Sequence, residues 1–302
     1  MTSMDTASSD TETAAPSAVK ATRRPLPAYF EVLKPKETAL LTFIGLAAAL
    51  LAARGHPDPG RLGIAFVAIL IASGGCNAIT NYLDRNVDAL MRRTSYRAIP
   101  SRRIYPAEKA LPLAIGLVVI GLVIAAWLNP LTLVFGLLGT LTAVVGRKMS
   151  ITHILGGISS CAPVVVGWLA FGPNLTPTLW LLCALIMVWV PIHVWSLMMA
   201  YREDYLQAGV RMFPVTWDIG SATRMLLGLS VLLWAISIAL YFVAGLGVIY
   251  LAVSVILGGI MVYANLRLVG SDAHKTAWKV YKLSAYPYLG IIFLAMFVGL
   301  WV

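Results

Sequence analysis

Long apolar runs separated by short polar segments dominate the chain from residue 29 onward. An apolar helix of about 20 residues is long enough to cross the hydrocarbon core of a bilayer. The pattern therefore predicts an all-α, polytopic membrane protein with about nine transmembrane helices. We expect these helices at 38–53, 62–83, 110–128, 130–146, 153–171, 178–200, 221–244, 248–269 and 284–302.

Residues 1–28 carry a different pattern, rich in Ser, Thr, Ala and acidic residues and then in Pro. They contain no apolar stretch of the kind that a secretory signal needs. Such a composition cannot bury enough apolar surface to fold alone. We therefore predict a disordered cytoplasmic tail over 1–28 and one transmembrane domain over 29–302.

The composition agrees with a membrane protein. Hydrophobic residues make up 59% of the 302 residues and charged residues 12%, with a mean hydropathy of +0.82. A soluble domain carries about 25% charged residues, so most soluble folds are excluded. Cys76, Cys161 and Cys183 lie in apolar runs without CxxC spacing, which predicts neither a disulfide framework nor a zinc site.

The charge is unbalanced, with 23 Lys and Arg against 13 Asp and Glu and a net charge of +10. Lys and Arg in short loops are retained on the cytoplasmic side of a membrane. With the N-terminus inside, the outer loops hold only Arg54 and Arg61. We therefore expect a cytoplasmic N-terminus in a plasma-membrane protein. This topology accounts for the positive surplus without a nucleic acid partner.

The second expected helix ends in a polar run. Spacings of 4, 3 and 4 residues link Asn77, Asn81, Asp84 and Asp88, which places all four on one helical stripe. Carboxylates at membrane depth are costly and normally point into the bundle or a wet cavity. The stripe therefore predicts a polar site, the alternative being a solvated helix end just outside the hydrocarbon.

The segment after this stripe suggests a ligand. Two carboxylates at i and i+4 suit Mg²⁺, which binds one or two carboxylates together with substrate phosphate oxygens and water. Arginine binds phosphate through two parallel hydrogen bonds. Five arginines follow within fifteen residues of Asp88, at 92, 93, 97, 102 and 103. The pattern predicts a metal-bridged diphosphate site, although topology and anionic lipid also explain arginines on this face.

A second long polar loop follows the sixth expected helix. His193 and Asp204 are eleven residues apart, so on an unbroken helix they would share a face, with His193 roughly 16 Å deeper. An acid and an imidazole would then line one cavity. A single histidine in a spanning helix is also compatible with a structural, hydrogen-bonded role.

These motifs resemble the UbiA superfamily of intramembrane prenyltransferases. The resembling segments are 29–36, 77–103, 156–168 and 189–215. His193 ahead of the Asp204-Tyr205 pair is most similar to the branch of the family that acts on heme. The chain departs from the usual motifs in four places. Thr80 stands four residues before Asp84 in place of Asn, and Ala208 stands where a further acid would follow Asp204. The segment 191–194 reads Pro-Ile-His-Val instead of Pro-Pro-His-Phe, and Leu141 and Gly146 replace a Tyr and a basic residue before Arg147.

The resemblance implies a UbiA-like bundle that transfers a farnesyl group from farnesyl diphosphate to a vinyl group of heme B, with Mg²⁺ as cofactor. It implies that Asp84, Asp88 and Asp204 are catalytic and hold the metal. His193 would contact heme B, either as a ligand of the heme iron or as a hydrogen bond donor to the heme. Binding of the diphosphate is expected from Asn77, Asn81, Arg93, Arg97, Arg147, Lys148 and, at the entry of the first span, Lys36. A heme A synthase or an oxidase assembly protein is the candidate partner.

Other functions share parts of this pattern. A UbiA-type enzyme for a quinone or another aromatic precursor would keep the diphosphate site and would not need His193. A transporter would place polar residues in broken helices near mid-bilayer, whereas these acids gather at one membrane face. A structural subunit of an oxidase gives no reason for the acids to lie beside arginines.

Overall fold

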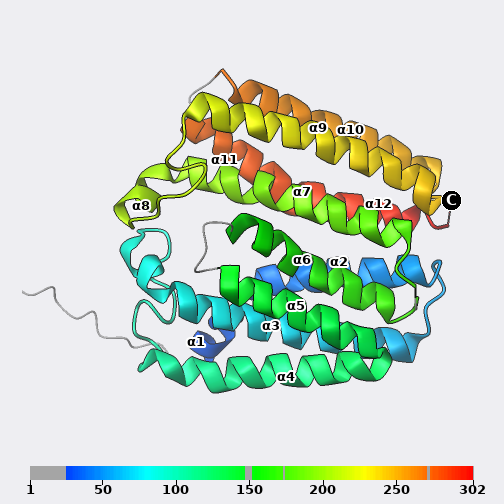
Figure 1. The fold of residues 1–302 in the computed structure, drawn as a ribbon, viewed down its shortest axis with the longest axis horizontal. Helices are drawn as coiled ribbons and strands as arrows, with labels where there is room; N and C mark the ends of the chain where they lie inside the picture. Colours follow the sequence, from blue (N-terminus) through cyan, green and yellow to red (C-terminus); the bar gives the residue numbers. More distant parts are fainter. Residues whose placement is uncertain (1–24, 147–151, 173, 271–272, 302) are drawn as a thin grey trace, which may run out of the picture.

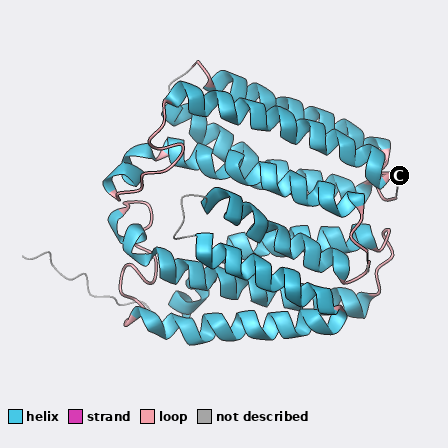
Figure 2. Ribbon diagram, viewed as in Figure 1, coloured by secondary structure: helices cyan, strands magenta, loops and turns pink. Residues whose placement is uncertain are grey.

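The computed structural model describes residues 25–146, 152–172, 174–270 and 273–301. Within these ranges the regular structure is entirely helical, as Figure 2 shows. The helices form one bundle, with most of them running along its long direction (Figure 1). The all-α class expected from the sequence is confirmed for the described residues.

The elements, in chain order, are bounded as follows: α1 Pro25–Val32, α2 Pro35–Ala52, α3 Pro59–Leu90, η1 Ala107–Lys109, α4 Ala110–Leu128, α5 Pro130–Gly146, α6 Thr152–Leu169, α7 Pro177–Ala200, α8 Arg202–Gln207, α9 Ile219–Ala244, α10 Val248–Leu268, α11 Ala273–Leu283, η2 Ser284–Gly290 and α12 Ile291–Val298. The first helix begins at Pro25, inside the tail expected over 1–28, while residues 1–24 lie outside the described residues.

Seven helical segments in the described residues are long and apolar enough to cross a membrane, so the chain is a multi-pass membrane protein. The helices α5 and α6 are apolar but shorter, and the expected number of nine spans is therefore not established. The last span runs over His274–Val298 rather than beginning at 284. Its first part, α11, is strongly amphipathic, with lysines among its apolar residues, which hid it from a search for continuous apolar runs.

Helix starts follow from short sequence features. Proline occupies the first turn of α2, α3 and α7, where its missing N–H costs no hydrogen bond. The side chain of Asp58 accepts a hydrogen bond from Arg61 N at 2.7 Å, and Asp218 accepts one from Ser221 N at 2.8 Å. Hydrogen bonding from Ser221 lowers the pKa of Asp218. Each cap satisfies a backbone donor that the first turn of a helix leaves free.

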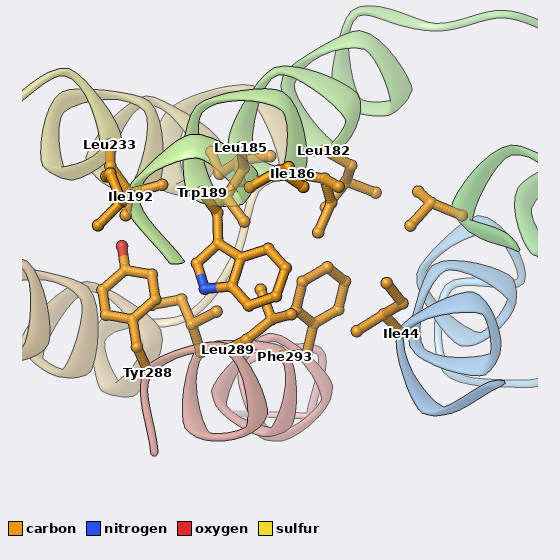
Figure 3. Packing of buried hydrophobic residues seen from close by; sticks show 14 of the residues in the cluster. Ile44, Leu182, Leu185, Ile186, Trp189, Ile192, Leu233, Tyr288, Leu289 and Phe293 are labelled. Atoms are coloured by element: carbon orange, nitrogen blue, oxygen red, sulfur yellow. The ribbon is translucent and has the colours of Figure 1, made fainter. Parts of the chain in front are cut away.

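The core centres on α7 and the C-terminal helices. In Figure 3, Trp189 and Ile192 of α7 lie against Tyr288 and Phe293, all of which are buried. In a bilayer, packing and small residues hold helices together because lipid is as apolar as the core. Gly75 shows this close packing, since a Cβ there would come within 2.6 Å of Ala114 O on α4.

Candidate functional site

A cavity of about 540 Å³ runs along α3 and is also lined by residues of α2, α4, α5, α6 and α7. Its lining on the α3 side extends from Ala68 to Met91, a rise of roughly 35 Å along a helix. The two ends differ in chemistry. Near Met91 the walls carry Asp84, Asp88, Arg93 and Arg97, whereas near Ala68 they carry Ile69, Leu122, Ala125 and Val166. A charged head and a long apolar tail would fit such a space together.

The acidic stripe lies on one continuous helix, because α3 runs on to Leu90. Asn77, Asp84 and Asp88 line the cavity, together with Thr80. Asn81 does not line it: its Nδ2 donates to Val32 O at 2.7 Å, which ties α3 to α1. Spacing alone placed Asn81 on the stripe, but this hydrogen bond turns its side chain toward α1.

Asp88 forms an ion pair at the charged end of the cavity. Its side chain is 9% exposed, and Oδ2 accepts a hydrogen bond from Arg97 Nη1 at 2.8 Å. Thr94 Oγ1 also donates to Asp88 O at 3.0 Å. The arginine-rich loop is thus fastened to the end of α3, which holds Arg97 at the charged end of the cavity.

Arg93 connects this loop to the second motif. Its Nη2 donates to the hydroxyl of Tyr205 at 3.3 Å, and its Cζ lies 5.3 Å from the centre of the Tyr201 ring. Burial raises the pKa of Tyr205, while the neighbouring Arg93 acts in the opposite direction. Figure 1 shows α8 and the loop after α3 at the same end of the bundle.

The second motif differs from its expected geometry. Helix α7 ends at Ala200, Tyr201 departs from helical geometry, and α8 begins at Arg202. The condition under which His193 and Asp204 would share one face, an unbroken helix between them, is therefore not met. Tyr205 lines the cavity and Asp204 is not among its lining residues. No group of three or more His, Cys, Asp and Glu side chains lies close enough to hold a metal in the described residues.

Three basic residues expected at the site lie elsewhere or cannot be placed. Lys36 is exposed and lines a smaller neighbouring cavity of about 320 Å³, together with Asn81. Lys34, at the N-cap of α2, lines both cavities. Arg147 and Lys148 lie outside the described residues.

His193 lies in a stack of aromatic rings on the wall of the cavity. Its ring centre is 4.8 Å from that of Trp189 and 4.6 Å from that of Tyr281. Its Nδ1 is 3.0 Å from Ser284 Oγ. Both faces of the imidazole are therefore covered and one ring nitrogen has a partner.

Comparison with known proteins identifies the family. Residues 40–300 match the UbiA prenyltransferase family. The chain belongs to this family. It is 34% identical over 281 residues to the protoheme IX farnesyltransferase of Desulforudis audaxviator, covering 91% of this chain and 88% of that protein.

Solved structures of other proteins share the UbiA fold. A digeranylgeranylglyceryl phosphate synthase gives a TM-score of 0.76 at 21% identity, covering 91% of this UbiA-family chain and 98% of that chain. A UbiA homolog from Archaeoglobus fulgidus bound to GPP and Mg²⁺ gives 0.65 at 15% identity, covering 89% and 99%. At these identities the likeness shows the fold.

The donor set of the UbiA-family cavity fits a magnesium ion that arrives with a diphosphate. Asp84 and Asp88 supply hard carboxylate oxygens one helical turn apart, and Arg93 and Arg97 lie in the same charged end. Mg²⁺ is bound through one or two carboxylates plus phosphate oxygens and water. A site completed by its substrate needs no cluster of three acidic side chains.

Several residues that line the cavity or contact His193 were not named as site residues from the sequence. Thr80 lies three residues after Asn77 and four before Asp84, so the helical period contained its position, but its small hydroxyl was passed over. Tyr205 follows the acid that the motif emphasised. Tyr281 and Ser284 lie before or at the start of the last expected span, and only the tertiary packing brings them to His193.

Proposed function

We propose that this UbiA-family chain transfers a farnesyl group from farnesyl diphosphate to a vinyl group of heme B, forming heme O. One observation carries the proposal: a single cavity joins a charged end of acids and arginines to an apolar interior, with His193 on its wall. The relative from Desulforudis audaxviator, named a protoheme IX farnesyltransferase, supports the choice of heme over other aromatic acceptors.

The charged end would bind the diphosphate. Arg93 and Arg97 would contact its oxygens, and Asp84 and Asp88 would hold Mg²⁺ against it. When bound, the metal neutralises charge that builds on the diphosphate. The guanidinium groups act on the same charge, since donors aimed at developing charge stabilise the transition state most. Asn77 would orient the acids; its Nδ2 donates to Thr38 Oγ1 at 2.9 Å, which fixes its side chain.

The reaction needs no covalent nucleophile from the protein. The bond between farnesyl C1 and the diphosphate oxygen breaks, and the diphosphate leaves with the electron pair. The terminal carbon of the heme vinyl group bonds to C1. Water then adds to the other vinyl carbon and releases a proton, which gives a hydroxyethyl farnesyl side chain. The apolar walls around Ile69, Leu122 and Val166 would hold the farnesyl chain away from water.

The cellular setting follows from the same assignment. The charged end of the cavity would face the cytoplasm, where farnesyl diphosphate is soluble, with the N-terminus on that side of the plasma membrane. Heme B and the farnesyl chain are both apolar and would enter from the bilayer. A heme A synthase or an oxidase assembly protein is the expected recipient of the product.

Expression in a host that lacks heme O tests the proposal. Hemes extracted from its membranes are separated by chromatography and weighed by mass spectrometry. We expect a farnesylated heme from the wild-type chain and much less of it from Asp84→Asn present at the same level in the membrane. Absence of that product from wild-type membranes supplied with farnesyl diphosphate and heme B would reject the function.

A further inference from the structure

The residues around His193 leave only the edge of its imidazole ring accessible to a ligand. Trp189 and Tyr281 lie against its two faces, with interplanar angles of 12° and 29°. The Trp189 side is itself packed against the C-terminal helices, as Figure 3 shows. A ligand can therefore meet this imidazole only at its edge, in the plane of the ring, which is where the nitrogen lone pairs and N–H groups point.

Ser284 occupies one part of that edge. It is fully buried at the start of η2, and its Oγ lies 3.0 Å from His193 Nδ1. The Ser284 hydroxyl also donates a hydrogen bond to Tyr281 O, at an Oγ–O distance of 2.9 Å. Trp189 Nε1 donates to Ser284 O at 2.6 Å, which fixes the serine and the ring stack together.

Counting protons assigns the tautomer of His193. A serine hydroxyl has one proton and two lone pairs. With that proton donated to Tyr281 O, Oγ accepts from Nδ1, and Nδ1 then carries the hydrogen. In a neutral imidazole the other nitrogen then carries the lone pair. Within the described residues no protein group is hydrogen-bonded to Nε2, and His193 lines the cavity.

We infer that Ser284 is a positioning residue that holds His193 as the Nδ1–H tautomer and thereby presents the Nε2 lone pair to the cavity as a ligand for the iron of the heme substrate. The inference rests on the proposed function for the identity of the ligand. It replaces the two roles open from the sequence by one, since an Nε2 without hydrogen cannot donate to heme.

The tautomer can be measured without heme or turnover. The chain has four histidines, so ¹⁵N-histidine-labelled protein in bilayers is compared with His193→Gln to assign the His193 signals. We expect a protonated Nδ1 and an unprotonated Nε2 in the wild type, and a mixture of both tautomers in Ser284→Ala. Ser284→Thr keeps a hydroxyl and restores the wild-type pattern. A protonated Nε2 in the wild type overturns the inference.

The ligand role is tested by titrating ferric heme B into the full chain in nanodiscs, followed by visible and electron paramagnetic resonance spectra. We expect a nitrogen-ligand spectrum that His193→Ala loses. Loss of an outer hydrogen bond to a metal-binding histidine weakens affinity about 10–100-fold, which we expect for Ser284→Ala. Ser254→Ala is the matched control, because its hydroxyl donates to Leu251 O at 2.9 Å in the same local geometry, and no histidine of the described residues is hydrogen-bonded to it.

The outcomes separate this inference from the proposed function. Wild-type protein that farnesylates heme while its bound heme shows no nitrogen ligand overturns the ligand role and leaves the function standing. Equal heme affinity in Ser284→Ala and the wild type overturns the role of Ser284. Wild-type protein that makes no farnesylated heme rejects the proposed function, and the ¹⁵N measurement then still accepts or rejects the tautomer.

Discussion

The two polar motifs of this protein look alike in sequence and differ in structure. The first lies on α3, which continues without a break to Leu90, so Asn77, Asp84 and Asp88 share a wall of the cavity, and Asn81 alone of the stripe turns away to Val32. The second is divided between α7 and α8 at Tyr201, and there Tyr205 rather than Asp204 reaches the cavity. Helical spacing therefore locates side chains reliably only where the helix itself continues.

The largest expected effect comes from a comparison of Asp84 in the first motif with Asp204 in the second. Removing one group that stabilises transition-state charge costs about 10²–10³-fold in rate. We expect a loss of that size in farnesyl transfer for Asp84→Asn, which keeps the shape of the side chain and removes its negative charge. Asp204→Asn is the matched change in the second motif, and we expect a clearly smaller loss. Initial rates with purified protein measure both.

Equal losses for the two variants would show that the motifs contribute alike and would contradict the distinction drawn from the cavity lining. Protein levels in the membrane and thermal unfolding control for folding.

The next test concerns the ion pair that fastens the arginine-rich loop. Removing one partner of a buried ion pair lowers the free energy of unfolding by about 3–5 kcal/mol because the other charge is left buried without a partner. Arg97 is 30% exposed on its side chain, so we expect the low end, about 3 kcal/mol, for Asp88→Asn. Arg97→Gln in the Asp88→Asn background should recover part of this stability. Chemical unfolding of the single and double variants measures the coupling, and simple additivity would show that the pair stabilises nothing.

Hydrophobic patterning was enough to predict the helical class and most helix positions, because the length of an apolar run and a proline at a helix start are local properties of the sequence. The last span escaped it, since lysines interrupt the apolar pattern of α11. At the site, periodicity found Asn77, Asp84 and Asp88. It misplaced Asn81, because the carbonyl of Val32 on another helix decides where that amide points. Ser284 could not be found at all, since its contact with His193 spans 91 residues of sequence.

The smallest expected effect belongs to the contact that joins the two motifs. Tyr205→Phe removes the hydrogen bond from Arg93 while keeping the ring, and one such bond contributes about 1 kcal/mol. We expect a several-fold rise in KM for farnesyl diphosphate with little change in kcat, because Arg93 loses its support but keeps its charge. Steady-state kinetics at saturating heme measure this split.

The pH dependence of KM gives a second test of the contact between Arg93 and Tyr205. Burial raises the pKa of Tyr205, so the folded state favours the protonated hydroxyl. The associated stability is complete below the ordinary tyrosine pKa of about 10 and declines as the pH rises through the raised value. The ratio of wild-type to Tyr205→Phe KM should therefore stay constant from neutral pH to about 9. A ratio that changes within this range would mean that the tyrosine hydroxyl ionises there and that Arg93, rather than burial, controls its charge.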